Sequence, residues 1–265
     1  ALKVQGKKVG LVPTMGALHA GHASLVKRSV SENGVTVVSV FVNPTQFNDK
    51  NDLEKYPRTL EADCSLLEEC GAALVFAPSV SEMYPEPDTR QFSYAPLDTV
   101  MEGAFRPGHF NGVCQIVSKL FDAVQPDRAY FGEKDFQQLA IIREMVRQLN
   151  YSLEIVGCPI VREEDGLAKS SRNTYLSCEE RKAALCLSKA VKKGQELIRN
   201  GIAASEVLEP MCEIINGEPL AHIDYVSMVD ALSMQPVDSV NADVLVAMAV
   251  YIGKTRLIDN FSYEV

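Results

Sequence analysis

KVGLV at residues 8–12 leads directly into PTMGALHAGH at residues 13–22. The first run has the apolar pattern of a strand, and the second places His19 and His22 three apart at the expected start of a helix. Residues three apart share a helix face, and the first turn offers N–H groups and a positive dipole end to an anion. Gly21 lets a flat base or ribose approach the backbone. The stretch therefore indicates a nucleotide-phosphate site.

Two alternatives to this interpretation concern the histidines themselves. For a bare H-x-G-H, two ordinary histidines in a solvated helix start are the simpler explanation. A zinc pair would need a third or fourth ligand, and only His109 and His222 remain, while the cysteines form no C-x-x-C pair. The preceding strand and a matching cationic motif far downstream favour the nucleotide.

The composition of the chain narrows the classes of function. A net charge of −9 without a long basic run argues against nucleic acid as a partner. No apolar stretch is long enough to span a bilayer, and residues 1–8 lack the apolar core of a signal peptide. Seven scattered cysteines, among them Cys114 in an apolar run, are typical of reduced thiols in a cytoplasmic protein.

The first part of the chain alternates strand-like and helix-like segments. This alternation predicts an α/β fold with a doubly wound parallel sheet, in which ligands bind beyond the carboxyl ends of the strands. We expect strands at 8–12, 35–42, 72–77, 128–131 and 153–157, and helices at 53–70, 111–124 and 135–150.

The pattern changes near residue 160. Ser177 and Glu180 form a potential capping box for a helix that runs to about Asn200. A second helix and three strand-like runs follow, which predict a smaller C-terminal α+β domain with an antiparallel sheet. The expected domains are 1–160 and 161–265, with a helix at 203–216 and strands at 220–229, 243–251 and 254–260.

Two of four further segments at strand ends offer amides and a flexible loop. At residues 41–47 the neutral amides of Asn43 and Gln46 can hold a hydroxyl and a carboxylate without adding charge, although a simple turn explains the same pattern. Residues 106–112 combine glycines with Arg106 and His109. This segment is equally well interpreted as a mobile flap that contacts an anion or as a structural loop.

The other two segments offer cations. In residues 131–138, Gly132 follows a strand, Lys134 lies near a helix start and Gln138 lies one turn further, which favours a phosphate contact over a solvated lysine. Residues 166–173 place two hydroxyls between two cations, a set that suits a triphosphate. A polar interdomain loop is the alternative for this last segment.

The motifs together resemble a known family. H-x-G-H with a distant Lys-Ser-Ser-Arg is similar to the paired signatures of class I aminoacyl-tRNA synthetases and related nucleotidyltransferases. The match is closer to the pantothenate synthetase (pantoate–β-alanine ligase) family, over nearly the whole chain, although the start looks shortened within the family's first helix. The motifs that carry it are PTMGALH (13–19), FVNP (41–44), YPRT (56–59), RPGHF (106–110), FGEKD (131–135), SSRN (170–173) and RLIDN (256–260).

The resemblance implies a cytoplasmic homodimer with a Rossmann-like domain and a C-terminal lid. Pantoate would attack the α-phosphorus of Mg-ATP to give pantoyl adenylate and pyrophosphate, and the β-alanine amine would then expel AMP. His22 is the implied catalytic histidine, and His19, Lys134 and Arg172 are suitable groups, with Mg²⁺, for alignment and charge neutralisation at phosphorus. The metal ligands and the base for the amine stay unassigned.

The resemblance also implies specific contacts. Gln46 and Gln138 would hold pantoate, together with Asn43. The implied ATP contacts are Met15, Gly16, Ala17, Leu18, His19, Ala20, Gly21, His22, Gly132, Glu133, Lys134, Asp135, the backbone at Val161, Lys169, Ser170, Ser171 and Arg172.

Two other functions compete with this one. Another nucleotidyltransferase of the superfamily, acting on a phosphorylated substrate, would need more cations in the substrate pocket than Asn43 and Gln46 provide. A non-catalytic nucleotide-binding regulator would not need both histidines, Lys134 and the Ser-Ser-Arg run.

Overall fold

The computed structural model describes residues 6–265, so the part of the signal-peptide and shortened-helix predictions that concerns residues 1–5 lies outside it. The chain divides into two compact units. The first comprises Ala1–Asp98, Glu102–Glu133 and Gln137–Pro159, and the second comprises Thr99–Met101, Lys134–Phe136 and Ile160–Val265. The roles assigned to 1–160 (nucleotide and pantoate binding) and 161–265 (lid) stay predictions.

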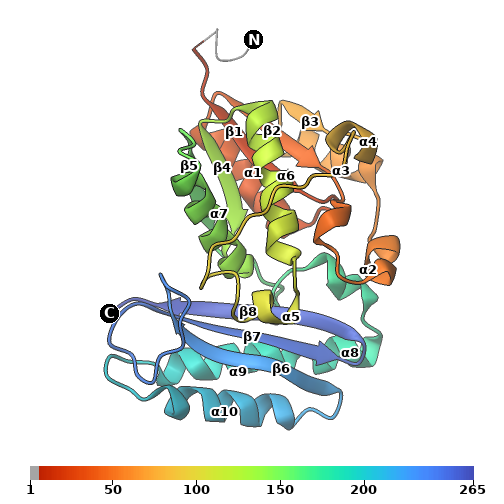
Figure 1. The fold of residues 1–265 in the computed structure, drawn as a ribbon. Coiled ribbons are helices and arrows are strands. Elements are labelled where there is room, and N and C mark those ends of the chain that lie inside the picture. The colour runs from red at the N-terminus through yellow and green to blue at the C-terminus, as the bar shows by residue number, and fades with distance from the viewer. Residues whose placement is uncertain (1–5) are drawn as a thin grey trace. The chain divides into compact units, whose positions relative to one another are not determined.

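A parallel sheet of five strands forms the centre of the first unit (Figure 1), as the alternating pattern predicts. The strand order is β3-β2-β1-β4-β5, so β1 lies between β2 and β4. The strands are β1 (Val9–Thr14), β2 (Val35–Val40), β3 (Leu74–Phe76), β4 (Arg128–Gly132) and β5 (Glu154–Cys158).

Helices cover both faces of this sheet. Successive strand residues point to opposite faces, and Leu11 belongs to the apolar cluster with α6 (His109–Val124) and α7 (Phe136–Gln148). Val12 belongs to the cluster with α1 (Ala20–Glu32) and α3 (Leu60–Glu69). The doubly wound architecture is therefore confirmed.

Two local predictions in the first unit are wrong, and two short helices were not predicted. The helix expected over 53–70 is two helices, α2 (Lys50–Lys55) and α3, because Pro57 cannot donate a hydrogen bond and disfavours helix at the preceding residue. The strand expected at 72–77, an apolar run typical of a buried strand, is the shorter β3 and lies at the sheet edge, where Leu74 is 51% exposed. The short helices α4 (Val80–Met83) and α5 (Glu102–Phe105) have no counterpart in the predicted pattern.

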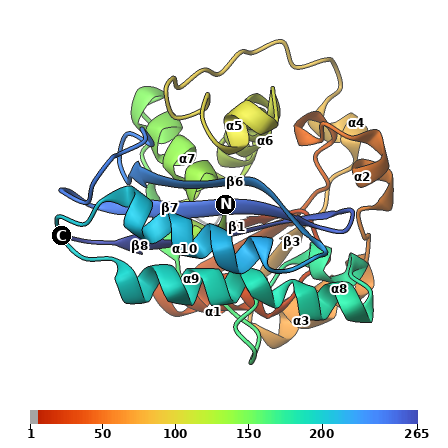
Figure 2. The same cartoon turned by 90° about the horizontal axis from the view of Figure 1, so that it is seen from below.

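The second unit contains the predicted antiparallel sheet, with β6 (Ala221–Asp230), β7 (Val244–Ile252) and β8 (Thr255–Tyr263). Its apolar cluster joins β7 to α9 (Leu185–Leu197) and α10 (Ala204–Asn216), which lie along the sheet in Figure 2.

The capping box of Ser177 and Glu180 is confirmed at the start of α8 (Cys178–Ala183). The helix does not continue to residue 200 as expected, since a break at Ala184 separates α8 from α9.

All seven cysteines are free thiols, and Cys70, Cys114, Cys158 and Cys186 are buried. Burial raises the pKa of the Cys114 thiol to about 12. Within residues 6–265, the structure contains no helix with the length and apolar character that a membrane crossing requires.

Candidate active site

The histidine turn, residues 15–22, connects β1 to α1 as predicted. Thr14 starts the turn: its hydroxyl donates to the Ser39 carbonyl at 2.7 Å and accepts from the Gly16 N–H at 3.2 Å. Gly16 has φ +79°, a conformation that glycine adopts without a steric penalty. His19 then has an extended backbone and is the N-cap residue of α1.

The two histidines cap α1 reciprocally. The Gly21 N–H donates to Nδ1 of His19 at 3.1 Å, and the His19 N–H donates to Nδ1 of His22 at 3.3 Å. The ring centroids are 4.1 Å apart. Because Nδ1 of each neutral ring accepts a hydrogen bond, the ring proton lies on Nε2. The turn therefore provides two imidazole N–H donors of fixed tautomer.

This cap occupies one of the backbone N–H groups expected at the phosphate site. The sequence suggests that the first-turn backbone N–H groups of α1 receive the anion, but the Gly21 N–H already donates to His19. The cap thus removes one backbone donor, and phosphate binding by the imidazole N–H groups stays a prediction.

Several predicted segments follow neighbouring strands of the parallel sheet. The histidine turn follows β1, Asn43 and Gln46 follow β2, and Gly132 is the last residue of β4. Parallel strands end at the same edge, and β1 adjoins both β2 and β4. The chain adds β2 and β3 on one side of β1 and then β4 and β5 on the other side, so the strand order reverses at β1. Open α/β sheets bind ligands at the point where the strand order reverses.

Asn43 is a buried residue whose side chain contacts the Gln46 amide. It is 1% exposed, and its Nδ2 donates to Gln46 Oε1 at 3.1 Å and to the Gly112 carbonyl at 3.0 Å. Its Oδ1 accepts from the Tyr84 hydroxyl at 2.7 Å. Because Gln46 Oε1 accepts from Asn43, the Gln46 amide presents its NH₂ group, which lies 3.3 Å from Met15 Sδ. Asn43 thus orients Gln46.

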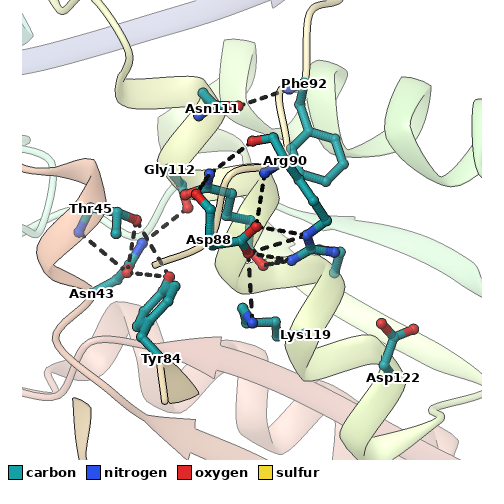
Figure 3. Close-up of polar contacts among 12 residues, drawn as sticks. Asn43, Thr45, Tyr84, Asp88, Arg90, Phe92, Asn111, Gly112, Lys119 and Asp122 are labelled. Atoms are coloured by element: carbon teal, nitrogen blue, oxygen red, sulfur yellow. Dashed lines mark hydrogen bonds and ion pairs between the residues drawn. The ribbon is translucent and has the colours of Figure 1, made fainter. Parts of the chain in front are cut away.

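Figure 3 shows the network that supports Asn43, and sequence reasoning did not identify it. The Tyr84 ring, whose hydroxyl donates to Asn43, lies 5.3 Å below the Lys119 ammonium. Lys119 and Arg90 both pair with the Asp88 carboxylate, at 3.6 and 2.6 Å. Hydrogen bonds from Arg90 lower the pKa of Asp88 to about 2, so the carboxylate stays charged at neutral pH.

The segment 106–112 packs against the same turn. His109 is buried, and its Nδ1 is 2.8 Å from the Gln46 carbonyl oxygen. A Cβ on Gly112 would clash with the Thr45 carbonyl oxygen, so only glycine fits this contact. These contacts support the structural-loop alternative for His109 and Gly112.

Two adjacent glutamines on α7 differ in their surroundings. Gln137 is buried, accepts from the Glu102 N–H at 3.0 Å and donates to the Leu97 carbonyl at 2.8 Å. The Gln138 side chain is half-buried and has no hydrogen-bond partner within residues 6–265. Gln137 therefore links α7 to the backbone at Leu97 and Glu102, whereas the Gln138 amide is available to a ligand.

In the second unit, the RLIDN motif holds the backbone of Lys134. Asn260 Nδ2 donates to the Lys134 carbonyl at 2.8 Å. The neighbouring Asp259, buried, accepts two hydrogen bonds from Arg162 at 2.8 and 2.9 Å. The Lys134 ammonium lies 3.8 Å from the Asp135 carboxylate.

The segment Lys169–Arg172 begins a short turn. The Lys169 N–H donates to the Val161 carbonyl at 2.9 Å, and its ammonium pairs with Glu163 at 2.6 Å. Ser170 Oγ accepts from the Arg172 N–H at 3.3 Å and caps the 3₁₀ turn Ser171–Tyr175. Backbone and cap contacts thus order the predicted phosphate-binding segment.

A resident metal ion would need a set of side chains among the described residues that could bind it. Within residues 6–265, no group of three or more His, Cys, Asp or Glu side chains is placed to hold a metal ion.

Comparison with known proteins places these observations in a family. The model of the pantoate-beta-alanine ligase family matches residues 1–262. The chain is 70% identical over its whole length to a pantothenate synthetase of Bacteroides thetaiotaomicron, covering 94% of that protein. It is 57% identical to a pantothenate synthetase of Ruminiclostridium cellulolyticum, with 98% of this chain and 93% of that protein covered.

Solved structures agree with this result. A pantothenate synthetase of Thermus thermophilus superposes with a TM-score of 0.92 at 49% identity, over 96% of this chain and 92% of that one. A Francisella tularensis pantoate-beta-alanine ligase complexed with beta-gamma ATP and beta-alanine superposes with a TM-score of 0.80 at 34% identity, over 97% and 90%. The chain belongs to the pantoate-beta-alanine ligase family, which confirms the resemblance and the predicted fold class.

Proposed function

We propose that the chain joins pantoate to β-alanine through a pantoyl adenylate. The pantoate carboxylate attacks the α-phosphorus of ATP and pyrophosphate leaves. The neutral β-alanine amine then attacks the acyl carbon, a proton leaves the nitrogen, and AMP departs with the bonding electrons. Adenylation replaces oxide, a poor leaving group, with AMP.

Family membership gives the class of reaction: the chain is an ATP-dependent ligase for pantoate and β-alanine. A different nucleotidyltransferase activity is not favoured, because the family match extends over residues 1–262 rather than over the histidine motif alone.

The observation that carries the adenylation step is the reciprocal cap of His19 and His22. With both Nδ1 atoms accepting from backbone N–H groups, each Nε2–H donates to oxygens of the ATP phosphates. Charge develops on these oxygens during attack at phosphorus, so donors of fixed orientation stabilise the transition state more than the ground state.

The other predicted contacts fall into two groups, one for ATP and one for pantoate. Lys134, Arg172 and Lys169 neutralise the phosphates, with Ser170 and Ser171 donating hydroxyl hydrogens. The remaining predicted contacts to ATP come from Met15–Gly21, Gly132, Glu133, Asp135 and the Val161 backbone. Gln46, oriented by Asn43, and Gln138 bind pantoate through their amide groups.

We also propose that Mg²⁺ arrives with ATP as part of the substrate. Mg²⁺ is commonly bound through one or two carboxylates and the phosphates of its substrate, and it keeps several waters. The donor set of residues 6–265, which lacks a cluster of metal-binding side chains, fits this arrangement. A homodimer in the cytoplasm, implied by the resemblance, completes the proposal, and seven free thiols suit a reducing compartment.

The test separates the two steps. Enzyme mixed with Mg-ATP and pantoate, without β-alanine, is expected to release about one pyrophosphate per active site, and AMP should appear only after β-alanine is added. Pyrophosphate release that requires β-alanine would contradict a separate adenylate. Light scattering of the purified chain measures whether it forms a dimer.

A further inference from the structure

We infer that Asp63 is a positioning residue for ATP, acting through the backbone of the histidine turn. The inference rests on the proposed contact of residues 15–22 with ATP. Nothing in the sequence pattern identifies Asp63, which lies in α3, far from the histidines along the chain.

The Asp63 carboxylate is buried against the turn. Asp63 is 2% exposed, and its Oδ2 accepts a hydrogen bond from the Ala17 N–H at 3.1 Å. Its Oδ1 accepts from the Leu18 N–H at 2.8 Å and from the Thr59 hydroxyl at 3.2 Å. Three donors therefore converge on one charged group, and such hydrogen bonds are stronger than neutral ones.

The turn needs this support because Ala17 has a left-handed backbone conformation, which is unfavourable for a residue with a Cβ. Gly16 and Ala17 have φ values of +79° and +50°. An alanine in the left-handed region persists only where its surroundings impose that conformation. A Cβ on Gly16 would lie 2.9 Å from Asp63 Oδ2 and 3.1 Å from Val40 Cγ1, so the turn packs closely on the carboxylate.

The carboxylate also occupies a position that suits an anion. Consecutive N–H groups in a turn that includes left-handed residues form a concave anion site, and here the anion is the protein's own Asp63. The Ala17 and Leu18 N–H groups consequently point toward Asp63. Leu18 directly precedes His19, whose N–H donates to His22, so Asp63 sets the position from which both imidazoles meet the phosphates.

A purely structural explanation is that Asp63 satisfies buried N–H groups and contributes stability alone. Asp127 provides the matched control, because its Oδ2 accepts from the Val9 N–H at 2.7 Å, at the opposite end of β1. Asp127→Asn tests the loss of a carboxylate–backbone bond to the same strand without touching the turn.

The experiment compares Asp63→Asn, Asp63→Ala and Asp127→Asn in the ATP- and pantoate-dependent release of pyrophosphate. We expect the KM for ATP to rise about 10-fold or more in both Asp63 variants, because a backbone N–H loses its charged acceptor. The KM for pantoate should change less. Asp127→Asn should lower the melting temperature and leave both KM values unchanged.

A second measurement does not depend on turnover. The chain has four histidines, so the imidazole nitrogen signals of His19 and His22 can be followed by ¹⁵N NMR. We expect both to shift in Asp63→Asn and to stay in place in Asp127→Asn. If Asp63→Ala fails to fold, Thr59→Val removes one donor to Oδ1, and a raised KM for ATP in this variant would support the inference.

Folded Asp63→Asn with an unchanged KM for ATP and unchanged His19 and His22 signals would overturn the inference, and so would equal effects of Asp63→Asn and Asp127→Asn. The proposed function fails separately, if His22→Ala releases pyrophosphate at the normal rate. These outcomes are distinguishable because the NMR signals report the turn whether or not the chemistry is as proposed.

Discussion

The histidine turn of the first unit and the Lys169–Arg172 segment of the second both carry proposed ATP contacts, but each holds a carboxylate differently. Asp63 is buried and accepts from backbone N–H groups of the turn. Glu163 is 34% exposed at its side chain and pairs with the Lys169 ammonium itself. The Asp63 carboxylate supports the backbone of the turn that carries the proposed donors. The Glu163 carboxylate instead pairs with the Lys169 ammonium, which we assign to phosphate binding.

The difference has an energetic consequence. The Lys169–Glu163 pair is partly exposed, at 24% and 34% of the two side chains, and ion pairs near the surface contribute little, about 0–1 kcal/mol. ATP can therefore displace Glu163 from Lys169 at small cost. Removing a buried acceptor leaves backbone N–H groups unsatisfied, which costs about 1–3 kcal/mol per group. We therefore expect the first region to be preorganised and the second to exchange partners on binding.

The largest effect is expected in the first region. His22→Ala removes an imidazole donor to the phosphates, and adenylation should fall by about 10²–10³-fold, the loss seen for one oxyanion-hole donor. The measurement is pyrophosphate release with ATP and pantoate. His22→Gln is the control, because glutamine at this helix position keeps the capping bond to the His19 N–H and hence stability, without the imidazole. Near-normal pyrophosphate release from folded His22→Ala would show that the histidine turn does not contribute to adenylation as proposed.

Smaller losses are expected for Lys134 and Arg172, two cations of the second unit. Lys134→Ala and Arg172→Ala should each weaken ATP use by about 10- to 100-fold, as expected for a lost charge-assisted hydrogen bond, with the β-alanine requirement little changed. Arg172→Lys keeps the charge and removes bidentate geometry. Lys192→Ala, an exposed lysine on α9, controls for net charge. An increased KM for β-alanine with ATP use intact would show that the residue is misplaced.

The pantoate residues test how far preorganisation extends in the first unit. Gln46→Ala and Gln138→Ala should raise the KM for pantoate about 10-fold and spare ATP affinity, since each deletes one amide partner of a polar substrate. Gln137→Ala, next to Gln138, should instead lower the melting temperature because its amide joins Glu102 to Leu97. Separate titrations of ATP and pantoate decide this, and lost ATP affinity with pantoate affinity retained would reverse the assignment.

The smallest effect tests the Glu163 carboxylate directly. Glu163→Gln should lower the KM for ATP by up to about 5-fold, because Lys169 no longer has a competing partner, and the gain should shrink at high salt. Glu164→Gln makes the same charge change one residue along, at an exposed side chain, and should have a weaker effect. A raised KM in Glu163→Gln would mean that both carboxylates support their regions, and the contrast would disappear.

Most elements of both sheets could be predicted because their signals are local. The alternation of apolar runs and helices indicates the parallel sheet, and the capping box at Ser177 marks the start of α8. The failures are equally physical. Pro57 divides a helix that polarity alone makes continuous, and the edge position of β3 depends on strand order, which the composition of the strand does not encode.

The sequence by itself determined the change from strand to turn to helix start at residues 8–22, most strands of the two sheets and the motifs that identify the family. These features depend on residues within one or two turns of each other. Only the tertiary structure decided that Asn43 orients Gln46 with help from Tyr84, and that Asp63 holds the histidine turn. The contacts of Tyr84 with Asn43 and of Asp63 with Ala17 join residues more than 40 positions apart. Periodicity carries no information on which buried polar groups will meet once the strands are ordered.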